Sequence, residues 1–139
     1  MTDRKFHLRL GCELETEKNS PSNLVVDVLT ANEWRPFKPG IETPGFLLFV
    51  YALFSCQLRY LRMNCAERNI VLASTTGELD LVAGEFWDVK SVFVRFRSVL
   101  KSGLPTADDI DYFKERMKHC PVSTNLSERV DMRHDIRFD

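Results

Sequence analysis

The stretch Phe46-Leu-Leu-Phe-Val-Tyr-Ala-Leu-Phe-Ser-Cys56 is the dominant apolar run of this chain, and it follows directly on Thr43-Pro44-Gly45. Proline is tolerated in the first turn of a helix, and a threonine before it suits the N-cap. Charges appear only from Arg59 onward, so the pattern predicts one long helix over about residues 44–69. Because its first half is apolar on nearly every side, other elements must wrap it.

The segments before this helix predict a β-hairpin. Apolar and polar residues alternate over residues 6–14, and a second apolar segment spans 24–29. The polar break at residues 19–23 is expected to be the loop between them. Residues 33–40 include two prolines and are expected to be a loop.

The segments after the helix complete an α+β pattern. Thr106 and Asp109 resemble a capping box, which predicts a shorter helix over residues 107–118. Pro121 suits the first turn of another short helix. Strands are expected at residues 70–82, 87–100 and 130–138. The chain shows no repeat and no linker, so residues 1–139 are expected to form a single domain.

Composition excludes several classes of function. The chain has 139 residues, 44% of them apolar, with 19 Lys and Arg against 20 Asp and Glu. A nearly balanced charge offers no basic field for a phosphate backbone, so no nucleic acid partner is expected. The apolar segment 45–58 is shorter than the roughly 20 residues of a spanning helix, so no membrane insertion is expected. With no recognisable signal or lipidation motif, a cytoplasmic location is expected.

Four cysteines and three histidines do not form a metal-binding pattern. No Cys-x-x-Cys pair is present, and His7, His119 and His134 have no zinc-ligand spacing with the cysteines. No metal and no other cofactor are expected. In a reducing compartment such cysteines are either catalytic or inert.

Cys56 and Cys120 occupy different contexts. Pro121 places Cys120 at or beside a helix N-cap, where free amides and the helix dipole favour a thiolate by about 0.3–1 kcal/mol. Cys56 lies mid-helix, where apolar surroundings raise the pKa of a thiol, so it needs a nearby cation. Arg59, three residues later, lies on the same helical face and is one source. The alternative is that both are packed, unreactive thiols, as Cys12 and Cys65 are expected to be.

These residues resemble the OsmC/Ohr family of thiol-dependent peroxide reductases. The similarity rests on Thr43-Pro44 and the apolar helix that reaches Cys56, on Arg62-Met-Asn-Cys-Ala-Glu-Arg-Asn-Ile-Val-Leu72, and on Cys120-Pro-Val-Ser123. It implies an OsmC-like fold and an intertwined homodimer with its active sites at the interface. It also implies that Cys56 attacks an organic hydroperoxide and that Cys120 resolves the sulfenic acid as a disulfide. A small dithiol such as dihydrolipoamide would then restore the thiols.

The chain departs from the family pattern at the groups that activate the attacking thiol. The family carries a carboxylate just after the helix-starting proline, where this chain has Gly45; Glu42 lies upstream. The family arginine comes from the N-terminal segment, whereas Lys18 is the only cation in the predicted loop here. Arg9 and Arg35 are the remaining N-terminal candidates to lie near Cys56. Without such a pair, a thiolate is scarce at neutral pH.

Three functions follow as hypotheses. The first is reduction of organic hydroperoxides through a Cys56/Cys120 dithiol cycle. The second, favoured by the missing carboxylate, is a binding protein that holds an acyl chain or another apolar ligand beside the central helix. The third is a hotdog-type thioesterase, which the chain supports least because no acid or amide is placed for hydrolysis at the helix start.

Overall fold

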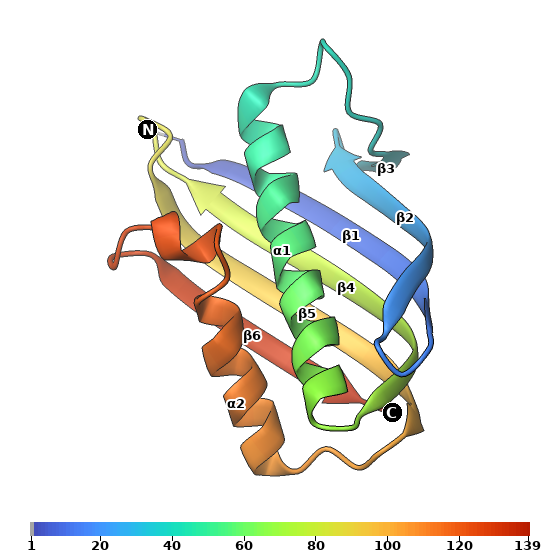
Figure 1. The fold of residues 1–139 in the computed structure, drawn as a ribbon. Helices are drawn as coiled ribbons and strands as arrows, with labels where there is room; N and C mark the ends of the chain where they lie inside the picture. Colours follow the sequence, from blue (N-terminus) through green and yellow to red (C-terminus); the bar gives the residue numbers. More distant parts are fainter. Residues whose placement is uncertain (1) are drawn as a thin grey trace.

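The computed structural model describes residues 2–139, and it forms one mixed sheet with helices on one face (Figure 1). The elements follow in the order β1 (Arg4–Glu15), β2 (Ser20–Thr30), β3 (Glu33–Pro36), α1 (Gly45–Glu67), β4 (Val71–Ala83), β5 (Val89–Ser102), α2 (Ala107–Lys118), a single 3-10 turn (Ser123–Asn125) and β6 (Asp131–Phe138). The α+β class and the order of the main elements are as expected.

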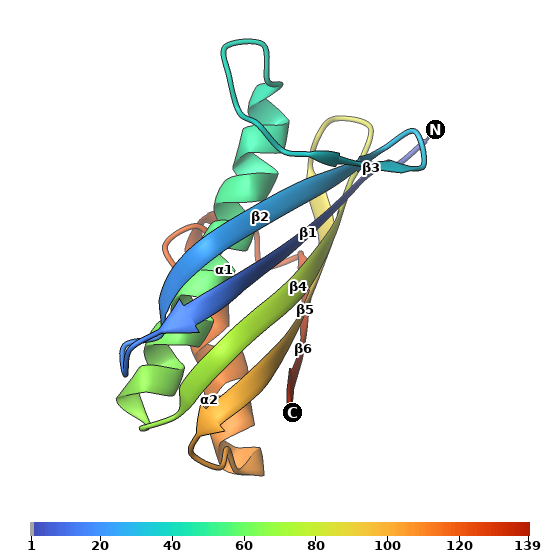
Figure 2. The same cartoon turned by 90° about the vertical axis from the view of Figure 1, so that its right-hand side faces the viewer.

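The six strands are arranged in the order β3-β2-β1-β4-β5-β6. Neighbouring strands are antiparallel except β5 and β6, which are parallel. A parallel connection needs a crossover, and α2 with the 3-10 turn supplies it. Figure 2 shows that α1 and α2 both lie on the same side of the sheet. The opposite side of the sheet is uncovered among residues 2–139.

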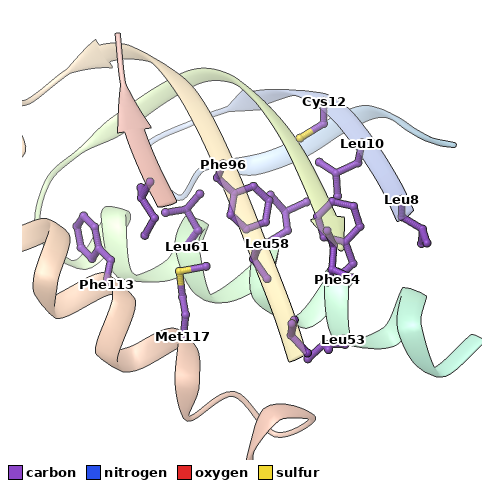
Figure 3. Close-up of a cluster of buried hydrophobic side chains, with 14 of the residues drawn as sticks. Leu8, Leu10, Cys12, Leu53, Phe54, Leu58, Leu61, Phe96, Phe113 and Met117 are labelled. Carbon is purple, nitrogen blue, oxygen red and sulfur yellow. The ribbon is translucent and has the colours of Figure 1, made fainter. Parts of the chain in front are cut away.

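The core lies between α1 and the helix-facing side of the strands (Figure 3). Alternate residues of β1, namely Leu8, Leu10 and Cys12, point toward the helices. Phe54 of α1 stacks on Phe96 of β5 with 5.9 Å between ring centroids. Full burial of such a side chain stabilises the fold by about 1.5–3 kcal/mol. The sheet and α1 therefore hold each other in place.

α1 begins and ends close to the predicted bounds, but its N-cap differs from the prediction. Pro44 is the N-cap and offers no side-chain hydrogen bond. Thr43 is not the cap, because its Oγ1 accepts from the Gly40 N–H at 2.8 Å. By length and composition alone the 23-residue helix could cross a membrane. Its buried stripe packs against the sheet, as in the core helix that the sequence predicted.

Three other sequence expectations were wrong. Residues Glu33–Pro36 form the edge strand β3, which two prolines obscured in the sequence; Pro36 is the last residue of the strand, where a missing donor costs little. The hairpin turn lies at residues 16–19 rather than 19–23. The short helix expected after Pro121 is only the 3-10 turn Ser123–Asn125.

Three polar residues, namely Thr106 and Asp109 at the start of α2 and Asn19 beside the end of α1, fix the ends of the helices. Thr106 accepts from the Asp109 N–H, and Asp109 accepts from the Thr106 N–H, so the predicted capping box and the bounds of α2 are confirmed. Asn19 has φ 54° and is buried. Its side chain bonds to the Arg62 carbonyl and to the Leu72 N–H, which fastens the first hairpin to the end of α1.

Candidate active site

The structure brings Cys56 and Cys120 together, although they are far apart in the sequence. Cys56 lies in the middle of α1, and Cys120 lies just after the end of α2. The two cysteines approach within 2.9 Å of each other, and both are free thiols. Cys120 is fully buried, whereas Cys56 is half-buried. A molecule from solvent therefore reaches the sulfur of Cys56 more readily than that of Cys120.

Gln57 is one of two residues of this site that sequence reasoning missed, and the other is His134. The side chain of Gln57 is fully buried, and its Nε2 lies 2.7 Å from the Met117 carbonyl and 2.8 Å from Ser123 Oγ. A carbonyl can only accept a hydrogen bond, so the NH₂ group of the amide must face Met117. Gln57 Oε1 then faces His134 Nε2 at 2.6 Å. Because Oε1 only accepts, His134 carries its proton on Nε2.

Cys120 lies among hydrogen-bond donors. The Gln57 side-chain amide has two N–H groups, and they donate to the two nearest acceptors, Met117 O and Ser123 Oγ. Ser123 accepts there, so its own hydroxyl proton is free to donate to Cys120 Sγ at 3.1 Å. The Ser123 backbone N–H also donates to Cys120 Sγ at 3.3 Å. The Cys56 thiol faces the same sulfur. The 3-10 turn is shorter than the helix that was expected, and its N-cap is Val122 rather than Cys120, but the Ser123 N–H still donates to the Cys120 sulfur.

These contacts shift the pKa values of the two thiols in opposite directions. Burial, together with its hydrogen bond to Cys120, raises the pKa of Cys56 to about 11, although the Val122 backbone and Arg59 oppose the shift. Burial also raises the pKa of Cys120, but hydrogen bonds from Cys56 and Ser123 outweigh it and leave that pKa below its usual value. When the pair carries one proton and one negative charge, the charge therefore lies on Cys120.

His134 completes the site from β6. Burial, with Lys118 and Lys114 nearby, lowers its pKa to about 4. The imidazole is therefore neutral near pH 7, and it acts on the thiols only by holding the Gln57 amide. Neither Gln57 nor His134 belongs to a recognisable motif. The one signal in the sequence is an amide at a buried position in the apolar half of α1.

Of the four cations considered near Cys56, Arg59 is the one that the structure places there. Arg9 pairs with Asp27 at 2.9 Å and lies on the uncovered side of the sheet. Arg35 pairs with Glu33 at 3.1 Å. Lys18 lies in the exposed hairpin turn.

Other residues considered for this site lie apart from the thiol pair. Glu42 is exposed in the loop before α1. Cys56 lies 11 residues after Gly45, which is about 17 Å along the helix, so Glu42 does not reach Cys56 within one subunit. His119 is exposed and pairs with Glu115 at 3.1 Å. Cys12 and Cys65 are buried in the core, as expected, and burial raises the pKa of both. No group of three His, Cys, Asp or Glu side chains within residues 2–139 is arranged to hold a metal.

The fold is similar to that of several solved proteins. An OsmC-like protein from Mycoplasma pneumoniae is 8% identical with a TM-score of 0.56, and the match covers 99% of this chain and 97% of that one. An OsmC-like hydroperoxide resistance protein from a Jannaschia species is 16% identical with a TM-score of 0.55, over 87% and 85% of the two chains. A Psychrobacter arcticus protein linked to osmotic stress and detoxification is 17% identical with a TM-score of 0.56, over 81% and 86%.

The chain therefore has the fold of the OsmC/Ohr proteins, as the sequence resemblance implied. No protein-family model and no curated protein matches the sequence. At these identities the likeness establishes the fold alone, so the chemistry of the site must be argued from its own residues.

The neutral His134 predicts a specific pH dependence of stability. Its folded pKa is about 4 and its unfolded value about 6.5, so the unfolded chain binds a proton first as the pH falls. The stability that the neutral His134 contributes is intact above pH 6.5 and is lost by pH 4. At about 1.4 kcal/mol per pH unit, the free energy of unfolding falls by about 3 kcal/mol over this range. Urea unfolding at both pH values measures it.

The matched variants are His134→Gln, which should lose less stability on acidification than the wild type, and His119→Gln, an exposed histidine whose removal should leave the loss unchanged. Equal losses in His134→Gln and in the wild type would contradict the buried, neutral imidazole.

Proposed function

We propose that this protein reduces organic hydroperoxides through a dithiol cycle of Cys56 and Cys120. The observation that carries the proposal is the approach of the two thiols within 2.9 Å, one half-buried and one fully buried. The OsmC-like hydroperoxide resistance protein of similar fold supports the same class of chemistry. Four free thiols favour a reducing compartment, and we place the protein in the cytoplasm.

The first step oxidises Cys56. The Cys120 thiolate takes the proton of the Cys56 thiol across their short contact, which leaves the negative charge on Cys56. The Cys56 thiolate attacks the terminal oxygen of the hydroperoxide, the S–O bond forms and the O–O bond breaks. The alkoxide that leaves takes the proton now held by Cys120. The products are an alcohol, a sulfenic acid on Cys56 and a thiolate on Cys120.

The second step forms the disulfide. The Cys120 thiolate attacks the sulfur of the sulfenic acid, an S–S bond forms, and hydroxide leaves to become water with a proton from solvent. A small dithiol such as dihydrolipoamide then reduces the disulfide and is itself oxidised to a cyclic disulfide. The catalytic residues of the proposal are Cys56 and Cys120, and no cofactor enters it.

The proposed dimer is supported by an uncovered stripe on α1. Four of its five residues carry no charge, and their spacing places them on one face of the helix: Leu48, Ala52, Ser55, Arg59 and Met63, all exposed. Within residues 2–139 no element covers the side of α1 that faces away from the sheet (Figure 1). We propose that a second copy of the chain covers this stripe, so that α1 of each subunit lies at the centre of the dimer.

A second function, binding of an apolar ligand without peroxide chemistry, is favoured by one observation. A groove of about 390 Å³ lies beside the start of α1, and its walls include Val28, Phe37, Ile41 and Leu47. The high pKa of Cys56 points the same way, because a protonated thiol reacts slowly with peroxides. On this account the groove holds an acyl chain and the thiols are not used.

One oxidation experiment separates the two functions. Stoichiometric cumene hydroperoxide should remove both thiols and form a Cys56–Cys120 disulfide, which intact mass detects as the loss of two hydrogen atoms. Cys120→Ser should stop at a sulfenic acid on Cys56, because the resolving sulfur is gone. A Cys12→Ser, Cys65→Ser double variant is the matched control and should react like the wild type.

Both thiols still free after peroxide treatment would contradict the peroxidase. Recovery of a bound lipid or acyl thioester from the purified protein would then favour the binding function.

The dimer predicts a change of mass in solution. Met63→Glu places a charge in the exposed stripe of α1 and should convert the protein to a monomer by light scattering. Leu24→Glu, at a similarly exposed apolar residue of β2, should leave the mass unchanged. A monomeric wild-type protein, or equal behaviour of the two variants, would rule out pairing through this stripe.

A further inference from the structure

The environments of the two sulfurs differ in a way that bears on the reverse half of the cycle, the reduction of the disulfide. Cys120 is enclosed and faces the N–H and the hydroxyl of Ser123 at 3.3 and 3.1 Å. Cys56 is half-buried on the exposed side of the pair. A reductant must attack one sulfur and displace the other, so the two environments determine which sulfur is attacked and which one leaves.

We propose that Ser123 and Gln57, with the Gln57 amide oriented by His134, hold Cys120 as the leaving thiolate of the disulfide, so that a dithiol reductant attacks the sulfur of Cys56. This inference rests on the dithiol cycle proposed above. Ser123 supplies two donors to the leaving sulfur. Gln57 donates to Ser123 Oγ at 2.8 Å and thereby turns the Ser123 hydroxyl proton toward the sulfur. Ser123, Gln57 and His134 are positioning residues here.

The exchange is balanced as follows. One thiolate of the reductant attacks Cys56, a new S–S bond forms to the reductant, and the Cys56–Cys120 bond breaks with its electron pair on Cys120. The second thiolate of the reductant then attacks the reductant's first sulfur, which is bonded to Cys56 in the mixed disulfide, and displaces the Cys56 thiolate. The reductant leaves as a cyclic disulfide, and Cys56 takes a proton from solvent. A leaving thiol of lower pKa departs faster, which is the advantage of the donors around Cys120.

The groups around Cys120 and the Gln57 amide come from four elements, namely α1, the 3-10 turn, β6 and α2. Cys56 and Gln57 lie on α1, and Arg59 on the same helix acts on Cys56. Ser123 lies in the 3-10 turn, and His134 approaches from β6 with Lys114 and Lys118 near it on α2. The imidazole stays neutral at and above pH 7, so it adds no charge beside the Cys120 thiolate there. Besides the Cys56 thiol, the donors at this sulfur are the fixed dipoles of Ser123.

The site of attack is read out without peroxide. The disulfide is formed with diamide, a monothiol such as 2-mercaptoethanol is added, and the mixed disulfide is trapped by alkylation and mapped by mass spectrometry. The monothiol is expected on Cys56 with Cys120 alkylated. A monothiol on Cys120, or no disulfide with diamide, would overturn the inference. Disulfide formation with diamide but not with peroxide would instead count against the proposed peroxidase alone.

The role of the donors around Cys120 is tested by removing, in turn, the hydroxyl groups of two neighbouring residues of the 3-10 turn. Ser123→Ala removes the O–H that faces the sulfur, whereas Thr124→Ala removes one that bonds to the Pro121 carbonyl. Ser123→Ala should slow reduction by dithiothreitol about three- to tenfold and raise the pKa of Cys120, measured by alkylation in a Cys56→Ser background, by about one unit. Thr124→Ala should change neither.

Gln57→Glu, which replaces the amide donors by oxygen, should act in the same direction as Ser123→Ala. If this buried substitution does not fold, the serine pair still decides the matter. Equal rates and equal pKa values in Ser123→Ala and Thr124→Ala would overturn the inference.

Discussion

The amide of one buried residue, Gln57, ties together the elements that make the site. From α1 it donates to the last turn of α2 at Met117 and to the following turn at Ser123, and it accepts from His134 on β6. A buried amide left without partners costs roughly 1–3 kcal/mol for each group, so these elements are held in one arrangement. The neighbouring residue on α1, Cys56, is thereby fixed against Cys120.

This arrangement answers part of the question raised by the missing carboxylate and arginine. The expectation was that Cys56 needs a cation to ionise, and Arg59 is the cation beside it. The stronger effect comes from the other thiol, because Ser123 and Cys56 itself direct their donors at Cys120. The resting charge therefore lies on the buried sulfur, and in the proposed cycle Cys56 becomes nucleophilic by passing its proton to Cys120. In that proposal the short contact between the two thiols takes the place of an external ion pair.

The sequence predicted those features that depend on local pattern. The alternation in β1, β5 and β6, the capping box of Thr106 and the apolar run of α1 each follow from neighbours in the chain, and these elements were located closely. β3 was missed because a four-residue edge strand ending at Pro36 has too few residues to show a period. Gln57 was missed because its partners lie 60 to 77 residues away. A polar residue in the buried stripe of α1 was the available clue.

The central claim is that Cys56 and Cys120 form one redox couple with a stabilised leaving thiolate, and equilibrium titration of the wild-type protein in dithiothreitol and glutathione buffers tests it most directly. The account predicts a single two-electron transition between dithiol and disulfide, at a potential above about −300 mV because stabilising the reduced form makes a disulfide more oxidising. Two thiols that remain free in the most oxidising buffer, or a transition below that potential, would contradict it.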